Sequence, residues 1–235
     1  MIEAGAAALA SALLDLLYPP RCAACGEGLA SSAEEPFCPV CREAVDPVPP
    51  GCARCGLPGP DAVCGACLAA PPAFTSCRAG GLFGGPLADA IHGFKYGRRS
   101  ALARPLGRWL AGRVPLLPEV AVVAVPLGRK RRLARGYDQA ALLARALAAA
   151  PGGPRALLPA ALRRTRETPP QVGRSREARL ANVRGAFVAG EAVRGRAIAL
   201  IDDVVTTGAT ADACARALLD AGARSVSVVA LARAE

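Results

Sequence analysis

The sequence predicts an α/β fold with a parallel sheet, preceded by a small cysteine-rich module. Two wholly apolar runs rich in Val and Ile, residues 120–125 and 197–201, are typical of strands buried on both faces, and each precedes a loop and a helical pattern. Eight of the ten cysteines lie between residues 22 and 67, in a stretch with little periodic apolar pattern. We therefore expect three parts: residues 1–18, residues 19–78 and residues 79–235.

Residues 1–18 are predicted to form a short amphipathic helix that ends before Pro19, since leucines recur at helical spacing: Leu9, Leu13, Leu16 and Leu17. The apolar run is short for a membrane span and is interrupted by Asp15, and Glu3 stands where a signal peptide carries positive charge. We expect no transmembrane segment, and a cytoplasmic protein that reaches a membrane only through its partners.

Residues 19–78 are predicted to contain two structural Zn²⁺ ions. The segment has four Cys-x-x-Cys pairs: Cys22/Cys25, Cys38/Cys41, Cys52/Cys55 and Cys64/Cys67. This spacing brings two thiolates to one ion, and two pairs complete a tetrahedral Cys₄ site. Metal binding would supply the folding energy that so small a segment lacks. We expect sequence neighbours to share an ion, with interleaved pairing as the alternative.

Two other interpretations of these cysteines are weaker. A disulfide-stapled secreted module would need a signal peptide, and redox catalysis at one Cys-x-x-Cys does not explain four copies. Cys77 and Cys214 are left over, and we expect both to be small buried apolar residues.

The remainder alternates helices and strands. Helical patterns occupy residues 86–112, 137–150 and 209–221, and strands are expected at residues 120–125, 197–201 and 225–231. This order indicates βαβ units and a parallel sheet.

The most informative segment is the loop at residues 202–210, between a buried strand and a helix. It contains two adjacent acids, three threonines and a glycine, and the following helix N-terminus favours an anion. We predict that it binds a phosphoribosyl group, with carboxylates accepting bonds from ribose hydroxyls. N-terminal capping of the helix is the alternative, but a cap needs only one such residue. The candidate residues are Asp202, Asp203, Thr206, Thr207, Gly208, Ala209 and Thr210.

The positive charge is concentrated in two segments. The net charge is +10, from 29 basic and 19 acidic residues, and residues 129–135 and 163–184 contain twelve of the basic ones. The first segment follows a strand at the carboxyl edge of the sheet, where we expect a loop that binds pyrophosphate: Arg129, Lys130, Arg131, Arg132 and Arg135. The second is interpreted as a flap, a track for a nucleic-acid strand, or a solvated basic loop.

Residues 21–78 contain four arginines against six acids, and each Cys₄ zinc site adds negative charge, so the zinc module is a poor candidate for binding nucleic acid. In the basic domain only Tyr137 and Phe187 lie near enough in sequence to stack on bases. We expect the single histidine, His92, to have a core or hydrogen-bonding role.

Together these motifs resemble the ComF family, which joins a double zinc ribbon to a type I phosphoribosyltransferase-like domain. Residues 202–210 are similar to the phosphoribosyl pyrophosphate motif of those transferases. Residues 126–139 resemble the family's basic Arg-Gly-aromatic-Asn-Gln stretch, with Asp138 where Asn is usual, and residues 92–96 resemble its lysine-tyrosine element. A spaced pattern also matches, with Arg174 where an apolar residue is common: Thr168, Gln171, Arg179, Asn182 and the pair Ala186-Phe187.

The resemblance implies a role in natural competence, in which single-stranded DNA is taken up at the cytoplasmic side of the membrane, and binding of phosphoribosyl pyrophosphate with Mg²⁺. If the second basic segment is a flap, its candidate site residues are Gln171, Arg179 and Asn182. We favour an accessory protein that binds a phosphorylated sugar, with single-stranded DNA and a DNA-uptake helicase as further candidate partners. The alternatives are a phosphoribosyltransferase with an unidentified acceptor base and a scaffold whose ribbon docks a partner.

Overall fold

The computed structural model describes residues 19–29, 35–154, 156–166, 183 and 185–234. The helix predicted for residues 1–18 lies outside the described residues. So do five residues of the segment expected to form a flap: Thr168, Gln171, Arg174, Arg179 and Asn182.

A five-stranded, wholly parallel sheet forms the centre of the molecule. Its order is β1 (Ser76–Leu82), β7 (Ser225–Arg233), β6 (Ala197–Val205), β2 (Ala121–Ala124) and β3 (Ala156–Leu157). The predicted parallel α/β fold is confirmed. β6 continues four residues beyond the predicted end, so Asp202 and Asp203 lie on the strand and not in the loop. The expected boundary after residue 78 falls inside β1.

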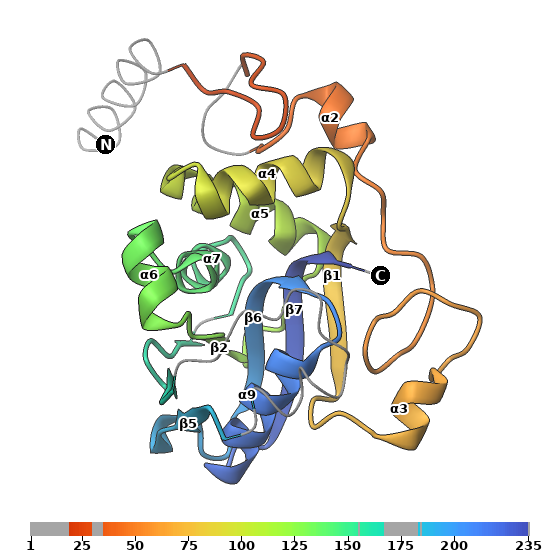
Figure 1. The fold of residues 1–235 in the computed structure, drawn as a ribbon, viewed down its shortest axis with the longest axis vertical. Helices are drawn as coiled ribbons and strands as arrows, with labels where there is room; N and C mark the ends of the chain where they lie inside the picture. The colour runs from red at the N-terminus through yellow and green to blue at the C-terminus, as the bar shows by residue number, and fades with distance from the viewer. Residues whose placement is uncertain (1–18, 30–34, 155, 167–182, 184, 235) are drawn as a thin grey trace.

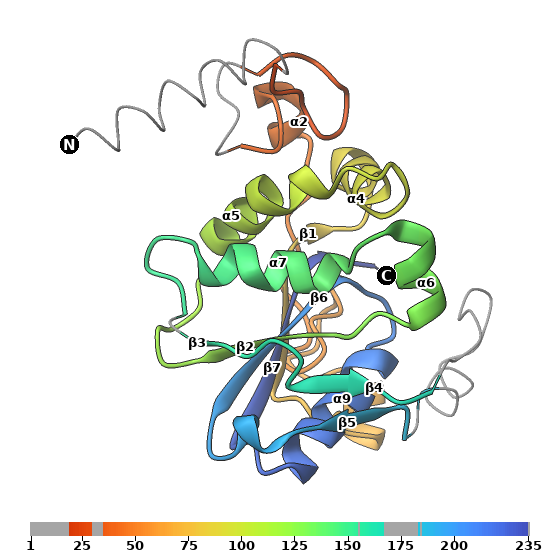
Figure 2. The same cartoon turned by 90° about the vertical axis from the view of Figure 1, so that its left-hand side faces the viewer.

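Both faces of the sheet are covered, which explains the unbroken apolar runs. The helices α4 (Gly85–Tyr96), α5 (Ala103–Arg113) and α7 (Gln139–Ala148) lie on one side, and α9 (Ala209–Asp220) lies on the other (Figures 1 and 2). Successive residues of β6 alternate: Ala199 and Ile201 join the core under α5 and α7, whereas Ile198 and Leu200 join the core under α9.

Two segments differ from the predictions. The single helical stretch expected at residues 86–112 is two helices, separated by Arg98 in the left-handed region (φ 53°) and by the short 3₁₀ helix η1 (Ser100–Leu102). The basic stretch expected to be a loop is a helix, α6 (Arg129–Arg135), which buries none of its residues. Lys and Arg are good helix formers, and Gly136 ends α6 at φ 84°.

A small antiparallel sheet lies beside α9. It consists of β4 (Leu162–Arg164) and β5 (Phe187–Ala189), and the 3₁₀ helix η2 (Glu191–Val193) follows.

The two cysteine-rich units pack against opposite sides of the sheet domain. The unit with α2 (Pro39–Glu43) lies over α4 and α5, where the rings of Phe37 and Trp109 meet edge-on at 5.7 Å. The unit with α3 (Gly65–Ala69) is followed by a segment that contacts α9 through Ala73. Among the described helices, none has the length and apolar character needed to cross a bilayer.

Candidate functional site

The eight paired cysteines form two tetrads. Cys22, Cys25, Cys38 and Cys41 make one and Cys52, Cys55, Cys64 and Cys67 the other, with all four sulfur atoms of each tetrad within 4.8 Å of one another. A tetrahedral Zn²⁺ with Zn–S bonds of ~2.3 Å has S–S edges of about 3.8 Å. Cys25 and Cys38 are 3.8 Å apart at sulfur, and Cys55 and Cys64 are 3.7 Å apart. The tetrads therefore fit two structural Zn²⁺ ions, and the predicted pairing of sequence neighbours is confirmed.

Backbone N–H groups point at the sulfurs, as thiolate ligands require. Although burial opposes ionisation of Cys22, N–H groups of Cys38, Cys25 and Ala24 lower its pKa to about 6. All ten cysteines are free, which argues against the disulfide interpretation. Cys77 and Cys214 are buried, as predicted.

A cavity of about 760 Å³ opens at the carboxyl ends of the parallel strands. Its walls come from the ends of β2 and β6, from α4 and α6, and from the first turn of α9. Open α/β sheets bind ligands at this edge, and the volume suits a small molecule. Of the residues predicted to bind the phosphoribosyl group, this cavity is lined by Asp202, Asp203, Thr206 and Thr210.

The other three loop residues face a second cavity, of about 650 Å³, which lies against the second cysteine tetrad. Thr207 accepts a bond from the N–H of Ala209, and Gly208 turns the chain from strand to helix at φ 76°. The loop therefore separates the two cavities.

The acidic pair is partly buried and the two carboxylates differ in their surroundings. Lys95 of α4 places its Nζ 2.9 Å from Oδ1 of Asp203. Asp202 accepts the N–H of Asp203 at 2.8 Å, and burial together with the neighbouring Asp203 carboxylate raises the pKa of Asp202 to about 8. Lys95 was not among the predicted site residues, although it lies in residues 92–96, the segment that resembles the lysine-tyrosine element.

The five basic residues of α6 do not act as one group. Only Arg131 and Arg135 line the first cavity; Arg129, Lys130 and Arg132 are exposed elsewhere on the helix. Arg135 donates to Oε1 of Gln139, whose Nε2 is buried and has no hydrogen-bond partner among the described residues. Asp138 caps α7 by accepting the N–H of Ala141, and it also accepts the N–H of Leu127. The Asp138 carboxylate therefore orders the loop before α6.

The aromatic residues at the cavity are not those expected. Tyr137 donates its hydroxyl to the carbonyl of Phe94, and Phe187 is buried beneath Arg164, so neither presents a free ring. Phe83, His92 and Tyr96 line the cavity instead. Of the two roles expected for His92, a core position or a hydrogen-bonding role, the structure excludes the core position, because His92 is exposed.

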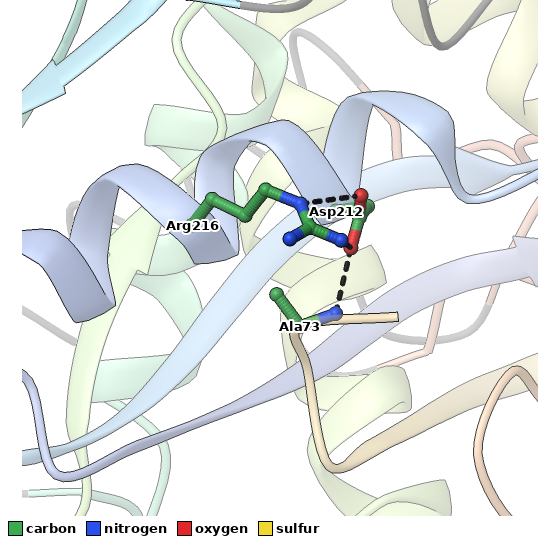
Figure 3. A network of polar contacts seen from close by, with 3 residues as sticks. All are labelled: Ala73, Asp212 and Arg216. Carbon is green, nitrogen blue, oxygen red and sulfur yellow. Dashed lines mark hydrogen bonds and ion pairs between the residues drawn. The ribbon is translucent and has the colours of Figure 1, made fainter. Parts of the chain in front are cut away.

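Two networks connect the second cysteine-rich unit, and the segment that follows it, to the sheet domain. Asp212, in the first turns of α9, accepts the backbone N–H of Ala73 at 2.6 Å and pairs with Arg216 at 3.0 Å (Figure 3). Arg233, which is 4% exposed, donates to the carbonyls of Cys55, Val205, Thr206 and Ala234. Among the described residues no carboxylate pairs with Arg233. A buried cation thus bridges a tetrad residue and the end of β6.

Comparison with known proteins finds a family model for the cysteine-rich module and relatives that span most of the chain. Residues 13–68 match the family model of the double zinc ribbon domain. DNA utilization protein YhgH of Salmonella typhi is 35% identical over 228 residues, which cover 93% of this chain and 99% of that protein. Its Escherichia coli K12 counterpart is 35% identical over 211 residues, or 84% and 90% of the two chains. Competence protein F of Haemophilus influenzae is 33% identical over 227 residues, or 91% and 97%.

Among the solved structures that match distantly is the glutamine phosphoribosylpyrophosphate amidotransferase from B. subtilis complexed with ADP and GMP. It aligns with 56% of this chain and 26% of its own at 24% identity and a TM-score of 0.39.

Proposed function

We propose a function from the premise that these relatives establish: the chain belongs to the ComF family of competence and DNA utilization proteins. In our proposal it is an accessory protein of DNA uptake that binds a phosphoribosyl pyrophosphate-like ligand in the first cavity and single-stranded DNA beside it. It would act in the cytoplasm, where the incoming strand arrives.

One observation carries the ligand assignment: carboxylates, a helix N-terminus and arginines line a single cavity. The first N–H groups of α9, with Thr206 and Thr210, suit the 5-phosphate. Asp202 and Asp203 can accept bonds from the two ribose hydroxyls. Arg131 and Arg135, on the wall formed by α6, suit pyrophosphate through charge-assisted bonds.

Mg²⁺ would accompany the pyrophosphate. It is a hard cation that prefers oxygen ligands and phosphates, and the carboxylates at the end of β6 are donors of that kind. Binding of phosphoribosyl pyrophosphate should therefore be stronger with Mg²⁺ than without it.

Calorimetry with ribose 5-phosphate tests the site. Thr210→Arg would fill the cavity beside the N-terminus of α9 and should abolish binding, whereas Arg216→Ala, on an exposed part of α9, should retain it. Asp203→Asn should weaken ribose 5-phosphate more than inorganic phosphate. Equal affinity in wild type and Thr210→Arg would place the phosphate elsewhere and would refute the assignment.

Single-stranded DNA would contact α6. All of its basic residues except Arg135 are exposed, and the zinc module has more acids than bases. The module would instead brace the sheet domain and dock a partner such as a DNA-uptake helicase. Val40 on α2 and Leu68 on α3 are 75% and 69% exposed and could supply apolar contacts for docking.

A phosphoribosyltransferase remains the second candidate, because His92 lines the cavity. An imidazole there could accept a proton from an acceptor base as the ribosyl bond forms. Pyrophosphate release should then occur with one nucleobase of a screened set and should be lost in His92→Gln. No release with any base, in protein that binds the ligand, would favour the accessory role.

A further inference from the structure

Three aromatic rings form a continuous row on one wall of the first cavity. Phe83 follows β1, and His92 and Tyr96 lie one turn apart on α4. The ring centroids of Phe83 and His92 are 5.9 Å apart, and those of His92 and Tyr96 are 6.1 Å apart. We refer to these three residues as the aromatic shelf.

The shelf is open to solvent at its outer end. Tyr96 is 70% exposed, so the fold uses little of this large ring for packing. The guanidinium of Arg135 lies 5.0 Å from the centroid of the Tyr96 ring. A ring with this exposure still has surface for another planar group, and the arginine beside it adds a cation–π contribution.

The charge around the shelf suits a strand of phosphates. The cavity is lined by five cations and three acids: Lys95, Arg98, Arg131, Arg135 and Arg164 against Asp138, Asp202 and Asp203. Two of the acids are already engaged, since Asp203 pairs with Lys95 and Asp138 accepts two backbone N–H groups. Arg98 and Arg131, both exposed, leave the rim next to the shelf positive.

We propose that the aromatic shelf stacks a nucleobase of single-stranded nucleic acid, with the adjoining phosphates on Arg98 and Arg131. Exposed aromatic rings interleaved with cations are how single strands bind without sequence readout, because every base has a π-face. The inference deepens the proposed function, since it assigns the strand to particular residues beside the ribose phosphate site. A free nucleobase shares the stacking chemistry, but an open shelf with a positive rim favours a base that is linked to phosphates.

The test measures anisotropy of a fluorescent single-stranded oligonucleotide at low salt. Tyr96→Ala should weaken binding by about 5- to 150-fold, the range expected for loss of one stacked base. Tyr96→Phe keeps the ring and should bind like wild type. Leu133→Ala is the matched control, because Leu133 is 73% exposed on α6 and does not line the cavity.

An oligonucleotide with abasic sites separates stacking from charge. It should bind wild type and Tyr96→Ala equally, while Arg131→Ala weakens both kinds of oligonucleotide. Equal binding of the normal oligonucleotide by Tyr96→Ala and Leu133→Ala would overturn the inference. Tyr96-dependent binding of free bases without any binding of the strand would overturn it too.

Ribose 5-phosphate calorimetry distinguishes the two proposals. Tyr96→Ala should bind ribose 5-phosphate like wild type, which also shows that the variant is folded. If wild type binds no ribose 5-phosphate but its DNA binding depends on Tyr96, the phosphate site fails and the shelf stands.

Discussion

Replacing Asp202 by Asn should make the unfolding stability less dependent on pH. The carboxyl has a pKa of about 8 in the folded chain, against an ordinary value of 3.8, because it is buried beside Asp203. Between those values the folded state retains a proton that the unfolded state has lost. The contribution of this proton to the free energy of unfolding is full below pH 3.8. It falls as pH rises through this window and is lost above about pH 8.

The slope within the window is about 1.4 kcal/mol per pH unit and does not depend on the exact folded pKa. The slope becomes shallower near pH 8, where the folded carboxyl begins to ionise. Between pH 6 and pH 8 the free energy of unfolding of wild type should therefore fall by about 2 kcal/mol relative to that of Asp202→Asn. The amide oxygen of Asn can still accept the Asp203 N–H, so the variant should retain the local bond.

Urea unfolding of both proteins at pH 6, 7 and 8, with zinc saturating, measures this difference. Asp89→Asn is the control, because Asp89 is exposed on α4 and should change stability by under ~0.5 kcal/mol at each pH. Parallel pH profiles for wild type and Asp202→Asn would show that Asp202 is ionised in the fold and would refute the reasoning.

Three further predictions concern the metal sites, Arg233 and α6. Elemental analysis should find two Zn²⁺ per chain, and Cys22→Ser and Cys52→Ser should each lose one; near-zero zinc in folded wild type would contradict the tetrads. Arg233→Met keeps much of the side-chain volume but removes the donors to four carbonyls, so it should lower the free energy of unfolding by about 3 kcal/mol and weaken ribose 5-phosphate binding. Equal urea midpoints for wild type and Arg233→Met would refute the stabilising role of these Arg233 hydrogen bonds. Arg131→Ala and Arg132→Ala should each reduce the log–log salt slope of DNA binding by about one unit or slightly less, and unchanged slopes would remove α6 from the interface.

The strands that were predicted correctly are those whose runs of apolar residues indicate burial on both faces of the sheet. β2 is an unbroken apolar run, as are the first five residues of β6, but β1 contains Gly80 and Gly81, which gave no strand signal. Tertiary packing explains both glycines. A Cβ on Gly80 would lie 2.5 Å from the ring of Trp109, and a Cβ on Gly81 would lie 2.9 Å from the carbonyl of Asp46. Close packing of the zinc module and α5 against β1 requires glycine there.

The site was predictable only where its residues are neighbours in sequence. The acids and threonines of the loop and the cysteine pairs each carry their own spacing signal. Lys95 and the aromatic shelf come from α4 and the end of β1, and only the folded chain brings them to Asp203 and α6. The sequence did not predict that Arg233 is buried beside the site, because an arginine at the end of an apolar strand is usually exposed to solvent.

The sheet order also constrains how the chain can be made. Among the described strands β1 pairs only with β7, and β7 lies between β1 and β6. During translation the tetrads can load zinc early, but β1 has no partner until residues 225–233 have been synthesised. Such a long-range pairing is slow to form, and the edge of β1 stays unpaired until β7 has been synthesised. Nascent chains stalled before β7 should therefore require chaperone protection.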